Sequence, residues 1–265
     1  MSGRYHHSVA TKTTPRRPAD GSTSEQPDSP AADQVGSLLL PIGHYVGIQH
    51  RGDTPAQATR QVRRGGTFHD LTDDQYALWA LAHGTPDAIQ DGAAWHRGLV
   101  EERARATGSA DPASTVDELL DLGLLVEVTS ADGQALEFAT RHRLVPLMLG
   151  LGNSPDEPDM FGIGFLQQPI VQVSHAIYDV WQWSTMDDSL WATCENAADV
   201  AQRAGSTAPE FVDPATLLSG VLSALHILLF TNAACLDIGF RLSWPNGPFS
   251  PAGAGSSGER NGDDD

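Results

Sequence analysis

The sequence has little positive charge. Lysine occurs once, at Lys12, and the chain has 16 Lys and Arg against 34 Asp and Glu, for a formal net charge of −18. The deficit runs along the chain, because residues 37–140 carry 7 basic and 15 acidic residues and residues 141–265 carry 5 and 15. Binding to nucleic acid requires a basic surplus that neutralises phosphates, and anionic membranes attract the same kind of surface. Both partners are therefore disfavoured.

Cysteine is also scarce. Cys194 and Cys235 are the two cysteines, and they are not spaced as a CxxC pair. Such a pair is typical of reduced, buried thiols in a reducing compartment. The N-terminus is polar where a signal peptide has its apolar segment. We therefore predict a cytoplasmic protein.

The sequence contains no known catalytic motif. GxSxG and HExxH are missing, and neither Gly150-Leu151-Gly152-Asn153 nor Gly162-Ile163-Gly164 fits GxGxxG or GxxxxGK, so we expect no catalytic residues and no cofactor. His175 and Asp179 are weak candidates for metal ligands, because a spacing of four residues places both on one face of a helix. A histidine on a helix is more often hydrogen bonded in the core, and we therefore expect no metal.

The longest apolar run, from Leu217 to Ile238, resembles a membrane span. It contains His226, Asn232 and Asp237 and has no basic flanks, so we interpret it as part of a buried helix. We identify no internal repeat. Composition predicts disordered tails at residues 1–36 and 243–265, the second of them acidic. Between the tails we predict an α+β, mainly α, protein with a domain boundary after residue 140.

Residues 37–140 are predicted to form a winged helix-turn-helix domain. Three short strands are expected first, at Tyr45–His50, Gln61–Arg64 and Thr67–His69. Three helices follow: one begins at the capping box Thr72–Gln75 and ends at Gly84, one covers Ala94–Ala106, and one runs from Ser114 or Thr115 to Gly123. The apolar stretch Leu124–Phe138, with a turn at Asp132-Gly133, is predicted to be the hairpin wing.

Residues 141–242 are predicted to form a small all-α domain. The helices are expected at Pro169–Trp183, Ser189–Ala204 and Pro214–Ile238, and the last is apolar on nearly every face, so it should lie in the middle of the bundle. Its aromatic cluster could line a ligand pocket or form the core, and we favour the core. The cluster consists of Tyr178, Trp181, Trp183 and Trp191.

The third helix of the first domain is acidic where a DNA reader needs Arg, Lys, Asn or Gln. Its polar positions include Asp117, Glu118 and Asp121. This charge favours binding of a protein or peptide over duplex DNA.

Residues 45–128 resemble the PqqD-like group, whose domains are recognition elements in the maturation of ribosomally made peptides. The resemblance rests on a few short motifs and departs from the group at the insertion Pro86–Ala94 and at the predicted hairpin. The motifs are Leu71-Thr72, Trp79, His83-Gly84, Glu118-Leu119-Leu120 and Gly123-Leu124-Leu125. We recognise no family for residues 141–242.

The resemblance implies that a peptide is added as an extra strand between Gln61–Arg64 and Val116–Leu122. On this interpretation the arginines attract acidic residues of the peptide, and apolar side chains of the helix line the groove. The residues concerned are Arg60, Arg63, Arg64, Val116, Leu119 and Leu120. Alternatively, the arginines form a solvated strand face.

The function predicted from these observations is non-catalytic binding of a peptide or protein, with presentation of a precursor peptide to a modifying enzyme as one form. A second copy of the chain is a further candidate partner. Two alternatives stay open. One is a winged-helix transcriptional regulator whose helical domain dimerises or senses a ligand, and the other is an enzyme whose active site lies in the helical domain.

Overall fold

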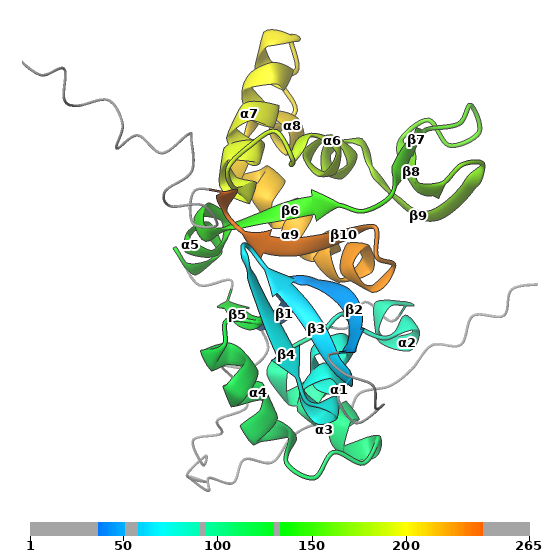
Figure 1. Cartoon of the computed structure of the whole chain (residues 1–265). Coiled ribbons are helices and arrows are strands. Elements are labelled where there is room, and N and C mark those ends of the chain that lie inside the picture. The colour runs from blue at the N-terminus through cyan, green and yellow to red at the C-terminus, as the bar shows by residue number, and fades with distance from the viewer. Residues whose placement is uncertain (1–36, 51–57, 91–93, 130–132, 241–265) are drawn as a thin grey trace, which may run out of the picture. The chain divides into compact units, whose positions relative to one another are not determined.

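The computed structural model describes residues 37–50, 58–90, 94–129 and 133–240 (Figure 1). The predicted tails, 1–36 and 243–265, lie outside the described residues, as does Asp132 of the predicted turn. The described residues have an α+β fold of helices and antiparallel sheets, which confirms the predicted class. None of the described helices combines the length and the hydropathy that a membrane span needs.

The first half of the fold begins and ends with paired strands. Its elements in order are β1 (Ser37–Pro41), β2 (His44–His50), β3 (Ala58–Arg64), β4 (Thr67–Leu71), α1 (Asp73–Leu81), α2 (Pro86–Gln90), α3 (Arg97–Ala106), α4 (Pro112–Asp121) and β5 (Leu125–Thr129). Strands β2, β3 and β4 form an antiparallel meander, and β1 pairs with β5. The predicted capping box is present, because Thr72 accepts from the Gln75 N–H and the Gln75 side chain accepts from the Thr72 N–H.

The third helix begins earlier than predicted. Asp111 is its N-cap, accepting a hydrogen bond from the Ser114 N–H, and Pro112 is the first helical residue. Proline suits the first helical position, because a backbone N–H there would have no acceptor within the helix and its absence costs nothing. The predicted capping box at Thr115 was therefore wrong, and the signal Asp-Pro was the stronger one.

The predicted wing hairpin is wrong. Strand β5 pairs with β1 instead, and Gln134–Arg141 forms a helix, α5, which buries Phe138 and Ala139. The pattern of Leu124–Phe138 fits a hairpin locally, but the apolar strand Ser37–Pro41 offers a longer-range partner. Whether the remaining features make a winged helix stays a proposal.

The second half of the fold is not all-α. Its elements are β6 (His142–Pro146), β7 (Leu149–Gly152), β8 (Met160–Phe165), β9 (Gln168–Ser174), α6 (His175–Trp183), α7 (Leu190–Arg203), α8 (Pro209–Val212), α9 (Pro214–Phe230) and β10 (Ala234–Ile238). Strands β7, β8 and β9 form a meander, and β6 pairs with β10. The predicted helix Pro169–Trp183 is a strand followed by a helix. The long apolar run likewise ends as a helix at Phe230 and continues as β10, because periodicity alone does not separate buried helix from buried strand.

These two halves are copies of one unit. Each has a strand, a three-stranded meander, helices, and a last strand that pairs with the first (Figure 1). Helices α1 and α6 each have nine residues and directly follow the meander, with Tyr76 and Trp79 matched by Tyr178 and Trp181. We call residues 37–129 repeat one and residues 142–238 repeat two. The expectation that the chain has no internal repeat was wrong.

The irregular positions of the repeats also match. The first strand of each meander carries a bulge against its neighbour, at Tyr45/Gly47 and at Gly150/Gly152. Left-handed residues occupy the same turns, and aspartate-proline pairs cap the same helices. These pairs of positions are Gly65 with Gln167, Gly123 with Asn232, and Asp111-Pro112 with Asp213-Pro214. Because Gly is replaced by Gln or Asn, and α9 has 17 residues where α4 has 10, the repeat is hard to see in the sequence.

The paired strands β1 and β5 belong to both cores. Leu39 is buried in the core of repeat one, whereas its neighbour Leu40 is buried with the residues of repeat two. Successive side chains of a strand point to opposite faces, so one strand serves two cores. Hydrogen bonds also join the repeats, including Gly43 N–H to the Leu236 carbonyl at 2.7 Å. Repeat one is thus packed directly on β10 and α9 of repeat two.

Candidate functional site

The predicted peptide groove does not lie at β3. That strand is the middle one of its meander, paired with β2 on one side and β4 on the other. Both rows of its main-chain groups are used, so no further strand can be added to it. Among the described residues, the outer strands of this meander, β2 and β4, each have a strand on one side only. The candidate site is the outer edge of β4, because Gln75, shortly after β4, contacts α4, the helix of the predicted groove.

The register of the hairpin shows which groups β4 offers at this edge. The turn has two residues, Gly65 and Gly66, so Arg64 and Thr67 form the hydrogen-bonded pair next to it. Phe68 then occupies a non-hydrogen-bonded position opposite Arg63, and its N–H and C=O point away from β3. Its side chain is 57% exposed. The sequence analysis missed Phe68, although an aromatic residue beside a Gly-Gly turn was a usable signal.

Two side-chain contacts reach α4 and the turn after it from the elements that flank β4. At the end of β3, the Arg64 guanidinium packs so closely on Gly123 that an added Cβ would lie 2.9 Å from its Cζ. In the first turn of α1, the Gln75 side-chain amide donates to Glu118 at 2.9 Å. These contacts connect the β3–β4 hairpin and α1 to α4.

The three predicted arginines do not form one patch. Arg60 pairs with Asp73 at 2.7 Å and lies over the Tyr76 ring, 5.0 Å from its centroid. Arg64, four residues along the strand, shares that face and contacts Gly123. Side chains alternate along a strand, so Arg63 is on the opposite face. Arg60 already has a carboxylate partner, which leaves it less available to an acidic peptide.

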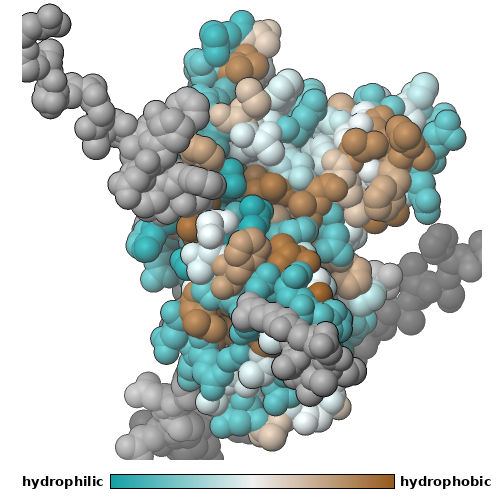
Figure 2. Space-filling model, in the orientation of Figure 1, coloured by the Kyte–Doolittle hydropathy of each residue, from teal (hydrophilic) through white to brown (hydrophobic). Residues whose placement is uncertain are grey.

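Two of the three predicted groove residues on α4 are inaccessible. Val116 and Leu119 are fully buried in the core of repeat one, and Leu120 is half-buried. The spacing that suggested a groove is the spacing of the core-facing side of α4. The solvent-facing side carries the acidic residues Asp117, Glu118 and Asp121. In the view of Figure 2, the surface over α4 is accordingly mostly hydrophilic.

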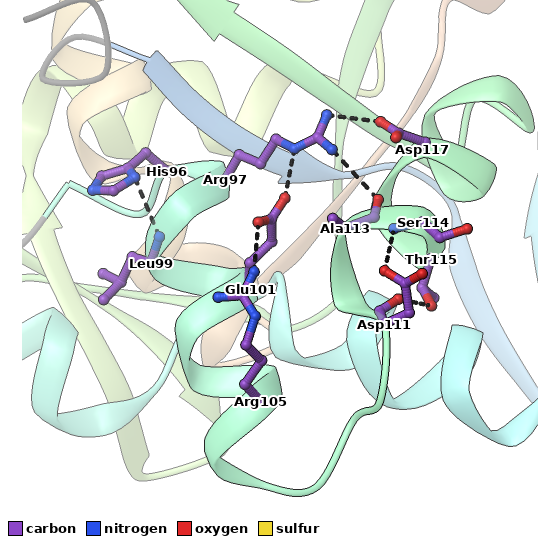
Figure 3. Close-up of polar contacts among 10 residues, drawn as sticks. All are labelled: His96, Arg97, Leu99, Glu101, Arg105, Asp111, Ala113, Ser114, Thr115 and Asp117. Atoms are coloured by element: carbon purple, nitrogen blue, oxygen red, sulfur yellow. Dashed lines mark hydrogen bonds and ion pairs between the residues drawn. The ribbon is translucent and has the colours of Figure 1, made fainter. Parts of the chain in front are cut away.

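Arg97 joins α4 to α3. Its guanidinium bonds Glu101 at 2.7 Å on its own helix, and Asp117 at 2.8 Å and the Ala113 carbonyl at 3.4 Å on α4 (Figure 3). Glu101 also accepts from Arg105 at 3.1 Å. The network fixes the position of the acidic face relative to the rest of repeat one.

Replacing Arg97 by methionine is expected to lower the free energy of unfolding by about 1–2 kcal/mol, because several charge-assisted bonds are lost together. Arg105→Met is the matched control: Arg105 is more exposed and makes one ion pair, so we expect less than about 0.5 kcal/mol. Urea unfolding of both variants measures the difference. Equal losses would contradict a bridging role for Arg97.

The weak metal candidates form an ion pair. His175 Nε2 lies 3.4 Å from the Asp179 carboxylate, and the described residues contain no cluster of three or more His, Cys, Asp and Glu suited to a metal ion. Both cysteines are free and buried, and burial raises the pKa of each thiol to about 12. Neither thiol is therefore set up as a nucleophile.

A comparison of the chain with protein-family models, curated proteins and solved structures found no match. The resemblance of residues 45–128 to the PqqD-like group stays a prediction from the sequence.

Proposed function

We propose that this chain is a non-catalytic module that binds an extended peptide segment as an additional strand on β4, beside α4. The observation that carries the proposal is the outward-facing main chain of Phe68 at the outer edge of β4. An open edge supplies main-chain hydrogen bonds, and the neighbouring helix supplies selectivity. The proposed site is one strand away from the one that the sequence predicts.

The charges on α4 and β3 favour a neutral or basic peptide segment over an acidic one at the β4 edge. The solvent-facing side of α4 carries Asp117, Glu118 and Asp121, and Arg60 at the adjoining strand is neutralised by Asp73. The same acidic face repels phosphates, which argues against duplex DNA as the partner. Together with the PqqD-like motifs, these charges support a precursor peptide as the ligand, held for a separate modifying enzyme in the cytoplasm.

The test is titration of fluorescently labelled precursor peptides, encoded beside this gene, with the full chain and two variants. Phe68→Pro removes the outward N–H and leaves the β3–β4 ladder intact, so we expect peptide affinity to fall by about tenfold or more. Phe68→Ala keeps the N–H and removes only the ring, so a smaller loss, about threefold, is expected.

Far-ultraviolet circular dichroism and thermal unfolding establish that both variants keep the fold. The proposal is wrong if Phe68→Pro binds like the unmodified chain, or if no peptide binds above background. Unlabelled duplex DNA serves as the competitor, and we expect it to displace none of the bound peptide.

A further inference from the structure

Repeat two contains a cavity lined by residues that the structure describes. It lies between α6, α7 and α8 and has a volume of about 750 Å³, within the usual range for small-molecule sites. Helix α6 contributes His175, Asp179 and Trp183 to its lining, the following loop contributes Asp187, and Phe211 of α8 lies on its border. The rest of the lining consists of Thr193, Asn196, Ala197, Val200 and Ala201 of α7 and of Ala204, Gly205 and Ser206 just after it.

The fixed charge in this cavity is negative. Asp179 and Asp187 are among the lining residues, and no Lys or Arg is. Asp187 accepts a hydrogen bond from Asn196, and Asp179 pairs with His175, which is a cation only when protonated. Burial raises the pKa of Asp179, and the neighbouring His175 opposes this shift. A carboxylate that lines an apolar cavity without a permanent counter-charge favours a cationic ligand over an anionic one.

Aromatic rings pack around His175, the partner of Asp179. The His175 ring stacks on Phe161 at 4.6 Å and meets the Phe211 ring edge-on at 5.5 Å. Trp183 also lines the cavity, and its side chain is 55% exposed. This departs from the prediction that the aromatic cluster is core, which is confirmed for the buried Tyr178 and Trp181. An exposed indole and a carboxylate that line one cavity suit a cation with an apolar body.

Repeat one shows that the fold does not need these residues. The equivalent groove between α1 and α3 has a volume of about 350 Å³. Helices α1 and α6 have the same length and align without a gap at Tyr76/Tyr178 and Trp79/Trp181. In this alignment Ala77 corresponds to Asp179 and Leu81 to Trp183. The same helix pair therefore packs with alanine and leucine, so the carboxylate and the indole are not required for packing.

We propose that this cavity binds a small organic cation, a primary or quaternary amine on an apolar or aromatic body. Asp179 supplies the counter-charge, Trp183 supplies an aromatic ring for the cation, and Phe211 with the α7 side chains holds the body. This site is separate from the β4 edge, and its ligand does not depend on the proposed peptide binding.

Calorimetric titration of the full chain with three probes of similar size tests the proposal. Phenethylamine, 2-phenylethanol and phenylacetate share a ring and differ in the charge of the head group. We expect saturable binding of the amine, at least about tenfold tighter than the alcohol, and no binding of the acid. Equal affinity for amine and alcohol, or the lack of saturable amine binding, overturns the proposal without any variant.

Two variants and a control then locate the site. Asp179→Asn is expected to weaken amine binding by about tenfold, and Trp183→Leu, the residue type of repeat one, by about threefold to tenfold. Asp199→Asn removes a negative charge from the exposed side of α7, outside the cavity lining, and should leave the affinity unchanged. An Asp179→Asn protein that binds the amine as tightly as the unmodified chain overturns the assignment.

Discussion

Replacing Asp237 by alanine is expected to lower the free energy of unfolding by about 3–5 kcal/mol. Asp237 on β10 is 2% exposed and accepts a hydrogen bond from the Gly65 N–H of repeat one at 2.6 Å. Its other carboxylate oxygen lies 3.6 Å from the largely buried guanidinium of Arg143. Alanine would leave a buried cation without its counter-charge and the turn N–H without its acceptor, and it would remove a link between the repeats.

Chemical denaturation of the full chain measures this effect. Asp237→Asn keeps an acceptor for the Gly65 N–H and removes only the charge. Its free energy of unfolding should therefore fall by less than that of Asp237→Ala. Asp199→Ala is the matched control, because Asp199 pairs with Arg203 on the exposed surface of α7 and such pairs contribute about 0–1 kcal/mol. A loss at Asp237 no larger than at Asp199 would show that this contact does not hold the repeats together.

Acidification from pH 6.5 to pH 4 is expected to destabilise the protein through His83 and His226. Burial lowers the pKa of each imidazole from 6.5 to about 4, and each ring bonds a carbonyl at 3.1 Å, of Trp79 and of Leu39 respectively. In this range the unfolded chain binds protons that the folded protein does not. The stability is therefore complete above pH 6.5 and is lost as the pH falls toward 4.

If the imidazoles were fully buried, acidification would lower the free energy of unfolding by up to roughly 3 kcal/mol for each histidine. Both side chains keep partial contact with solvent, so we expect about 2 kcal/mol for each. Denaturation at a series of pH values measures the loss. His226→Gln keeps a donor for the Leu39 carbonyl and cannot be protonated, so its stability should depend less steeply on pH. An unchanged slope would assign the acid sensitivity to other groups.

Local signals in the sequence predicted local structure well. The capping box at Thr72 starts α1, and Gly84 and Gly108 take left-handed conformations at the helix ends. The strands before α1 were also placed correctly, because alternation and the Gly-Gly turn act within a few residues. The acidic residues of α4 do lie on its solvent-facing side.

Pairings over long distances were not predictable in the same way. Strand β5 was expected to fold back on residues 135–138, whereas it pairs with β1, and β10 pairs with β6 in the same manner. The choice between these partners depends on which apolar surfaces meet, and Leu39 and Leu40 serve different cores. The internal repeat was missed for the same reason. Its two copies share strand pairing and backbone geometry but few identical residues.

The sequence by itself determined the acidic character of the molecule, the start of α1 and the presence of strands β2, β3 and β4, because these depend on neighbouring residues. Only the tertiary structure decided that β4 is an outer strand, that Val116 and Leu119 are core, and that Asp179 and Trp183 share a cavity. Each of these depends on contacts between segments that lie far apart in the chain, and on the burial that follows from them.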